Sequence, residues 1–193
     1  RSGTLTVREG EDVYDDFILP VECAVNSLES LDVLTAYLRG TGSLVLAALD
    51  GYHYVASVVN QIEFAQVMRG RDDRTFTVTF RCAPYRYKDN VTDIAITQSG
   101  SFVENPGNIA SEPIIKVTGS GDITLLIGTQ AVTLTGLDGS VTIDTPLKEA
   151  YDGDESMNGI MDGDFPTLAP GRSAISWTGS VTGVTITPNW RYV

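Results

Sequence analysis

Histidine and cysteine are nearly absent from this chain, which has one histidine, His53, and two cysteines, Cys23 and Cys82, in 193 residues. A Ser-His-Asp or Cys-His arrangement would have to be built on His53, and no nucleophile-elbow motif accompanies it. One histidine cannot form a His-rich zinc site, and the cysteines lack CxxC spacing. We therefore predict no catalytic, cofactor-binding or metal-binding residues, no cofactor and no enzymatic activity. We interpret His53 as a surface or interface residue.

Basic residues are also scarce, because 13 Lys and Arg face 25 Asp and Glu, a formal net charge of −12. Phosphate neutralisation requires a surplus of Lys and Arg on one face, and docking on anionic lipid requires the same. The composition argues against sequence-specific nucleic acid and membrane as partners. The excess of acidic residues favours solubility and mutual repulsion between copies before assembly.

Long hydrophobic runs are missing as well. The apolar stretches, such as residues 123–127, are interrupted by Thr or Gly, and none approaches the roughly 18 residues of a membrane-spanning helix. Apolar residues still make up 42% of the chain, which is enough for a core in one large or two small domains. We place a boundary near Lys88 and predict domains over residues 1–88 and 89–193.

One helix is predicted, over residues 27–39 of the first domain. Asn26 and Glu29 have the spacing of a capping box. Apolar residues from Leu28 to Leu38 recur at spacings of 3, 4 and 7, and Gly40 can adopt the positive φ that follows a helix end. We expect this helix to lie on an antiparallel sheet, which makes the first domain α+β.

The strands of that sheet are predicted from alternation and turn signals. Pro20 indicates that the strand over residues 18–25 lies at an edge or carries a bulge. Residues 75–82 alternate without error, which places Cys82 on the same face as the apolar residues before it. Cys23 is also in phase with apolar neighbours, so free buried thiols are favoured, and a disulfide between the two stays open. The other predicted strands are residues 4–7, residues 44–48, and one long bent strand over residues 52–68 that follows a hairpin signal at Asp50-Gly51.

The second domain is predicted to be almost entirely β. Short strands at regular spacing with turn signals between them are typical of a β-sandwich. The seven candidate strands are residues 91–98, 113–118, 123–127, 131–134, 141–144, 173–177 and 181–187. Gly119-Ser120-Gly121 joins two of them and opens no helix, so it is not a phosphate loop. Residues 148–170 form a long predicted loop, and such loops are usually functional or mobile.

Two acidic patterns in this loop are candidate sites. Residues 152–159 place oxygen ligands at alternate positions, as a calcium loop does, but without a glycine at the sixth position or a Glu at the twelfth. Asp162 and Asp164 would share a face on a strand, like a glycosidase pair, although that chemistry needs a defined separation across a cleft. An acidic turn is the favoured interpretation of both.

Aromatic residues near the end of the chain suggest an alternative function. Trp177, Trp190 and Tyr192 would provide a stacking platform for sugars in a carbohydrate-binding sandwich that recognises cell-wall glycan. Trp177 is in phase with Ile175, and tryptophans so placed are more often in the core.

Several segments, taken in order, resemble siphophage distal tail proteins, the hub rings that end a long non-contractile tail tube. Residues 76–87 close the first domain in a similar manner, and residues 34–44 and 52–56 match the helix–strand segment of that family. Residues 113–123, 164–171 and 175–179 match in the second domain. The resemblance covers most of the chain, and the order of the motifs is more specific than any one of them.

The resemblance implies a mainly β protein. In the full-length protein, a split-barrel-like antiparallel sheet with one helix would form a hexameric ring, and an outward-facing galectin-like β-sandwich would follow it. The expected function is that of a structural virion component, a distal tail or baseplate hub that joins the tail tube to the host-recognition apparatus of a phage or prophage. Its partners would be other copies, the tail tube, the tape measure and the receptor-binding or baseplate proteins. It would sit at the tail tip, after assembly in the bacterial host cytoplasm.

Two departures from the family pattern bear on this expectation. Family members carry further residues before the position of Arg1, which contribute strands to the ring, so we expect the natural N-terminus and the first strands to be absent here. The galectin-like fold does not bring sugar binding with it, because no cluster of His, Asn and Arg at lectin spacing is present.

Overall fold

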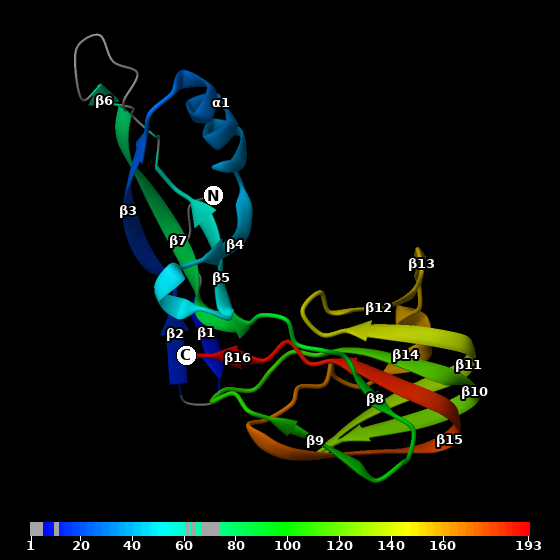
Figure 1. Cartoon of the computed structure of the whole chain (residues 1–193). Coiled ribbons are helices and arrows are strands. Elements are labelled where there is room, and N and C mark those ends of the chain that lie inside the picture. The colour runs from blue at the N-terminus through cyan, green and yellow to red at the C-terminus, as the bar shows by residue number, and fades with distance from the viewer. Residues whose placement is uncertain (1–5, 10–11, 61, 63–64, 67–73) are drawn as a thin grey trace. The chain divides into compact units, whose positions relative to one another are not determined.

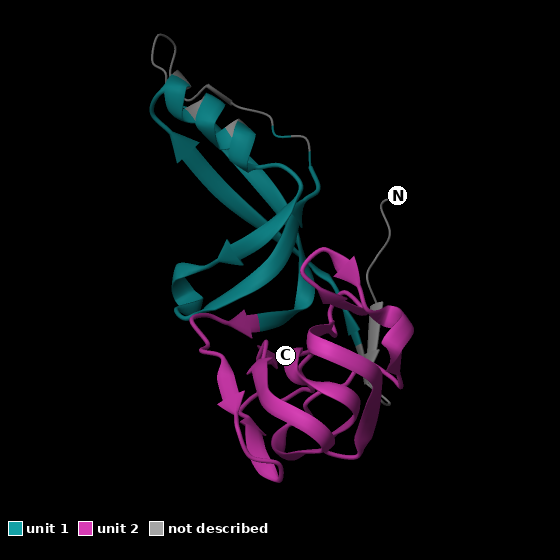
Figure 2. Ribbon diagram, turned by 90° about the vertical axis from the view of Figure 1, so that its right-hand side faces the viewer, with its two compact units in different colours: residues 1–86 teal, residues 87–193 magenta. Residues whose placement is uncertain are grey.

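The computed structural model describes residues 6–9, 12–60, 62, 65–66 and 74–193. The chain divides into two compact units, Arg1–Arg86 and Tyr87–Val193, which Figure 2 distinguishes by colour. Within the described residues the protein is mainly β, with antiparallel sheets and a single α-helix. This is the predicted fold class.

The helix α1 (Leu28–Tyr37) forms as predicted, but its cap differs by one residue. Ser27 is the N-cap, and its Oγ accepts a hydrogen bond from the Ser30 N–H at 3.1 Å. The proposed capping box of Asn26 and Glu29 was therefore wrong. At the other end the Leu38 N–H donates to the Leu34 carbonyl at 2.8 Å, and Gly40 follows with the expected positive φ of 71°.

The sheet of unit 1 is built around β7 (Arg74–Lys88). Along one side, β3 (Phe17–Val25) pairs with β7 from Phe17 opposite Cys82 to Val25 opposite Arg74. On the other side lies β5 (Tyr52–Val58), which pairs in turn with β4 (Thr41–Val45). Among the described strands β3 pairs with β7 alone, so Pro20 lies on an edge strand, as predicted.

Alternation along β7 follows the sequence prediction. Phe76, Val78 and Cys82 are buried, whereas Thr75 and Thr77 point outward and are exposed. Cys82 lies opposite Phe17, whose ring makes an edge contact of 5.2 Å with the ring of Tyr54 on β5. The core of unit 1 therefore lies on this face of the sheet, which we call the inner face, and α1 packs against β3.

The long bent strand predicted over residues 52–68 is interrupted, so that prediction was wrong. β5 ends at Val58, and the short β6 (Ala65–Gln66) pairs with the start of β7. Between them the Asn60 side chain donates to the Thr77 carbonyl at 2.8 Å and accepts from the Thr79 N–H at 2.7 Å. An amide side chain thus replaces backbone pairing at the break. Residues 61, 63–64 and 67–68 lie outside the described part.

The remaining elements of unit 1 are short. β1 (Thr6–Glu9) and β2 (Asp12–Asp15) form an antiparallel pair, which covers the described part of the strand predicted over residues 4–7. The hairpin predicted at Asp50-Gly51 forms between β4 and β5, with a short 3-10 turn, η1 (Ala47–Leu49), before it.

Three long strands dominate unit 2: β10 (Ile114–Ile127), β11 (Gln130–Asp144) and β15 (Gly171–Thr187). Six of the seven predicted strands merge in pairs to form them, so Gly119-Ser120-Gly121 is a bend within β10 instead of a connection between strands. Register shifts in β10 lie on both sides of this bend. The curvature of the three strands is visible in Figure 1.

The bends let each long strand contribute to two layers. In one layer the first half of β10 pairs with the second halves of β11 and β15, and β8 (Ile94–Ile96) and β12 (Glu149–Asp152) flank them. In the other, the second half of β10 pairs with the first halves of β11 and β15, flanked by β9 (Ser101–Asn105) and β14 (Met161–Asp162). β9 was missed by the sequence prediction.

Between these layers lies one hydrophobic core. Its fully buried members include Ile115, Leu125, Leu134 and Ile175, which come from three different strands. Burying a side chain of this size contributes about 1.5–3 kcal/mol each. The predicted loop over residues 148–170 is instead structured: it contains β12, β13 (Glu155–Ser156), the 3-10 turn η2 (Asn158–Ile160) and β14. The chain ends with β16 (Arg191–Tyr192).

Candidate functional site

His53 lies on β5 opposite Val45 and is half-buried. Among the residues that the structure describes, no group of three or more His, Cys, Asp or Glu side chains is placed to hold a metal ion. No helix in the described part of the chain is long and apolar enough to cross a membrane.

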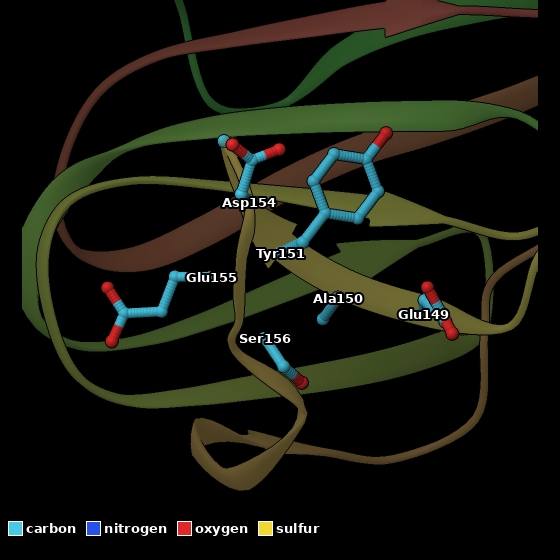
Figure 3. Close-up of a pocket in the computed structure, with 7 residues that line it drawn as sticks. Glu149, Ala150, Tyr151, Asp154, Glu155 and Ser156 are labelled. Carbon is cyan, nitrogen blue, oxygen red and sulfur yellow. The ribbon is translucent and has the colours of Figure 1, made fainter.

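The acidic segment 152–159 supplies the turn and second strand of the β12–β13 hairpin, and this hairpin lines a pocket of about 300 Å³. Tyr151 and Ser156 pair across the hairpin, and the carboxylates of Glu149, Asp154 and Glu155 point in different directions around the pocket (Figure 3). Asp152 accepts a hydrogen bond from the Ser140 hydroxyl at 3.0 Å. Carboxylates that diverge in this way do not form the cage that calcium requires.

The Asp162–Asp164 pair does not have the predicted arrangement. Asp162 ends β14, opposite Thr133, and Asp164 lies beyond the strand, so strand alternation does not place the two on one face. Both side chains are exposed. A glycosidase pair must flank a substrate across a cleft, and two exposed turn carboxylates have no such wall between them.

The aromatic platform is also not formed. Trp190 is only 6% exposed and belongs to the core of unit 2, while Trp177 and Tyr192 are partly buried and pack against that core. A sugar-stacking surface needs exposed ring faces, so the glycan platform proposed from these three residues was wrong.

Cys23 and Cys82 are free thiols. Both lie on paired strands, but Cys23 is opposite Phe76 and Cys82 is opposite Phe17, six residues further along the ladder. At about 3.3 Å per residue this offset is far beyond the reach of a disulfide. The interpretation as free thiols, rather than the disulfide, is therefore correct.

The candidate contact surface of unit 1 is the face of its sheet opposite the inner face, which we call the outer face. Ile18 lies opposite Arg81 across β3 and β7, and Ser43 lies opposite Val55 across β4 and β5, so these residues share that face. Ile18 is 54% exposed and Val45, two residues beyond Ser43, is 63% exposed. A solvated sheet face normally carries polar residues, so apolar side chains here indicate a contact surface.

A pocket of about 240 Å³ opens in the outer face. Residues from β4, β5 and β7 and from the link between β2 and β3 line it, and we call it the Asp16 pocket. Its lining consists of Asp16, Thr41, Val55, Ala56, Ser57, Arg81 and Ala83. Small side chains make up most of the wall, which is why the pocket remains open.

An ion pair lies beside this pocket. Arg81 Nε is 3.3 Å from Asp16 Oδ2, and the side chains of Asp16 and Arg81 are 7% and 27% exposed. Asp16 Oδ2 is buried and accepts no hydrogen bond. A buried acceptor that lacks a donor is unfavourable by about 1–3 kcal/mol, so its presence in a folded unit calls for an explanation.

Sequence reasoning did not identify the residues of this pocket. The outward phase of β7 was implied by the inward phase of Phe76 and Val78, which placed Arg81 on the opposite face. Nothing in the sequence, however, indicated that Asp16 and Thr41 would be brought beside Arg81, because cross-strand register depends on pairings far apart in the chain.

No protein-family model matches the chain, and no curated protein matches it. Among solved structures, its fold is similar to that of a protein from a phage adsorption apparatus. That protein is SPP1 Dit (gp 19.1), whose crystal structure is described as a paradigm of the hub adsorption apparatus in phages that infect Gram-positive hosts. The similarity covers 95% of this chain and 86% of that chain, with a TM-score of 0.66 and 13% sequence identity. The two proteins therefore share a fold.

Proposed function

We propose that this protein is a structural component of a phage or prophage virion, the distal tail hub of a long non-contractile tail. The observation that carries the proposal is the similarity in fold to SPP1 Dit, which extends over 95% of this chain and therefore over both units. A hub of this kind works through the contacts it makes and has no need of a reaction centre.

Self-association is the first element of the proposal, with a hexameric ring as the expected assembly of the full-length protein. The buried apolar residues of unit 1 in the described ranges are few, namely Ala56, Phe76, Val78, Cys82 and Tyr85. The same unit exposes Ile18, Val33, Tyr37 and Val45, and Tyr37 is 81% exposed. A small unit that leaves large apolar side chains in water gains stability when another chain covers them.

The two units would have different roles in this assembly. Residues 1–88 would make the ring, and residues 89–193 would face outward as a galectin-like sandwich with a large buried core of its own. The ring would join the tail tube to baseplate and receptor-binding proteins at the tail tip, after assembly in the host cytoplasm. It would also surround the tape measure and passing DNA, and a net charge of −12 gives DNA no surplus of cations to which it would bind.

Light scattering on the full-length protein over a concentration series tests self-association. The mass is expected to rise from that of one copy toward that of a closed ring as concentration increases. A mass that stays at that of one copy at every concentration would contradict the proposal.

A further inference from the structure

We propose that the Asp16 pocket receives an uncharged, hydrogen-bond-donating side chain from a second copy of this chain. This inference rests on the self-association in the proposed function and names the point of contact. It assigns the part of the outer face around the Asp16 pocket, and not the end of the sheet at Thr75, to the interface between copies.

The first step of the argument is the unsatisfied acceptor. The side chain of Asp16 is more than nine-tenths buried, lines the pocket, and has an Oδ2 atom that accepts no hydrogen bond. Arg81 Nε, at 3.3 Å from this oxygen, neutralises the charge of the carboxylate but does not donate a well-aligned hydrogen bond to it. A donor group entering the pocket would remove the cost of this acceptor on binding.

The second step concerns the charge of the occupant. Arg81 already neutralises Asp16, so another cation would be repelled by the guanidinium and another anion by the carboxylate. A hydroxyl or amide side chain can donate to the carboxylate without adding charge. The pocket therefore favours a neutral polar group.

The size of the pocket and its surroundings indicate a protein side chain. A volume of about 240 Å³ lies below the roughly 300–1,000 Å³ of typical small-molecule sites and suits one side chain. Exposed Ile18, Val45 and Val55 lie on the same face. An anchor in a pocket, with apolar contacts around it that exclude water, is the usual arrangement of a protein interface.

Charge also favours a second copy as the source of that side chain. Every copy carries a net charge of −12, so two copies can meet closely only where the surface adds little charge of its own. The two ionisable residues of the pocket lining, Asp16 and Arg81, cancel each other. The outer face around the pocket thus permits contact between acidic copies.

Filling the pocket tests the inference. Thr41 is exposed and lines the pocket, so Thr41→Leu would occupy it from the wall without altering Asp16 or Arg81. Thr75→Leu is the matched control, since Thr75 is an exposed residue of β7 in the same sheet but outside the pocket. Both variants are compared with the unaltered chain by sedimentation over a concentration series, and their melting temperatures report whether they fold.

We expect Thr41→Leu to raise the concentration needed for half-assembly at least tenfold. For Thr75→Leu this concentration should stay within twofold of that of the unaltered chain. The two variants and the unaltered chain should have the same melting temperature as monomers. In the unaltered chain, hydrogen exchange in residues 54–58 and 79–83 should also slow on assembly. In Thr41→Leu, exchange in the same residues should stay unchanged. Equal assembly of the two variants would overturn the inference while leaving the proposed function intact. A strictly monomeric unaltered chain would overturn both.

Discussion

Burial decides the chemistry of the two thiols at the scale of single residues. Cys82 is fully buried on the inner face of unit 1, whereas Cys23, on the neighbouring strand, is half-buried. Desolvation raises the pKa of the Cys82 thiol above its ordinary value of 9.0. Because the raised pKa favours the neutral thiol in the folded state, Cys82 contributes stability at neutral pH that is lost as pH rises above 9.0.

Alkylation by iodoacetamide at pH 8 should therefore discriminate between the two residues. Cys23 is expected to react at least ten times faster than Cys82, because the thiolate is the reactive form and Cys82 must first become exposed. Mass spectrometry of the peptides measures both rates, and denaturant serves as the control by making them similar. Equal rates in the folded protein would contradict the assigned burial of Cys82.

Strand phase made some single residues predictable and others not. The burial of Phe76, Val78 and Cys82 followed from an alternation that is complete within eight residues. Trp190 had no such pattern around it, since it follows Pro188-Asn189, and its burial depends on the core of a whole sandwich. Asp16 was unpredictable for the same reason, because its partner Arg81 lies 65 positions away.

Bends are the decisive local feature at the scale of elements. Gly179 has φ of 93° where β15 crosses between layers, and a Cβ there would collide with the backbone oxygen of Asp122. Gly171, at the start of β15, has a similar φ of 82° but open space around its Cα. Substitution of Gly171 therefore measures the free-energy cost of a left-handed backbone alone, whereas substitution of Gly179 adds the cost of a steric collision.

Gly171→Ala is expected to destabilise unit 2 by about 1–2 kcal/mol, through backbone conformation alone. Gly179→Ala should cost about 3 kcal/mol or more, because the backbone of β10 must also move. Urea unfolding followed by tryptophan fluorescence measures both, since Trp177 and Trp190 lie in this unit. Equal losses would show that the close approach at Gly179 has no energetic consequence.

A side chain holds the break between β5 and β6. Asn60→Ala removes two hydrogen bonds, one to the Thr77 carbonyl and one from the Thr79 N–H, and should destabilise unit 1 by about 1–3 kcal/mol. The Thr79 amide should then exchange faster with deuterium, which amide-resolved NMR detects. Ser43→Ala, at an exposed position of β4, is the control and should leave that amide unchanged. Unaltered exchange at Thr79 in Asn60→Ala would contradict the role of this side chain.

Element types were easier to predict than element ends. The helix was found from its apolar spacing, but Asn26 and Ser27 are both good caps, and only the backbone determines which one is used. Gly-rich segments were taken for turns between strands because turns and bends need the same positive-φ glycines. The sequence alone therefore could not distinguish six short strands from three long ones.

Contrast between the two units is the main property of the whole molecule. Unit 2 has a large buried core, whereas the described part of unit 1 buries few apolar residues and exposes more of the large apolar side chains than unit 2 does. The division of labour in a hub would follow from this contrast, with one unit folded for assembly and the other independent of it. The central claim is thus that copies of this chain associate through unit 1 to form a ring.

Negative-stain electron microscopy of the protein at assembling concentration tests this claim most directly. The account predicts closed rings of identical subunits around a central hole, and predicts that Thr41→Leu reduces their number while Thr75→Leu does not. Dispersed single copies under the same conditions, or open aggregates without a closed ring, would contradict it.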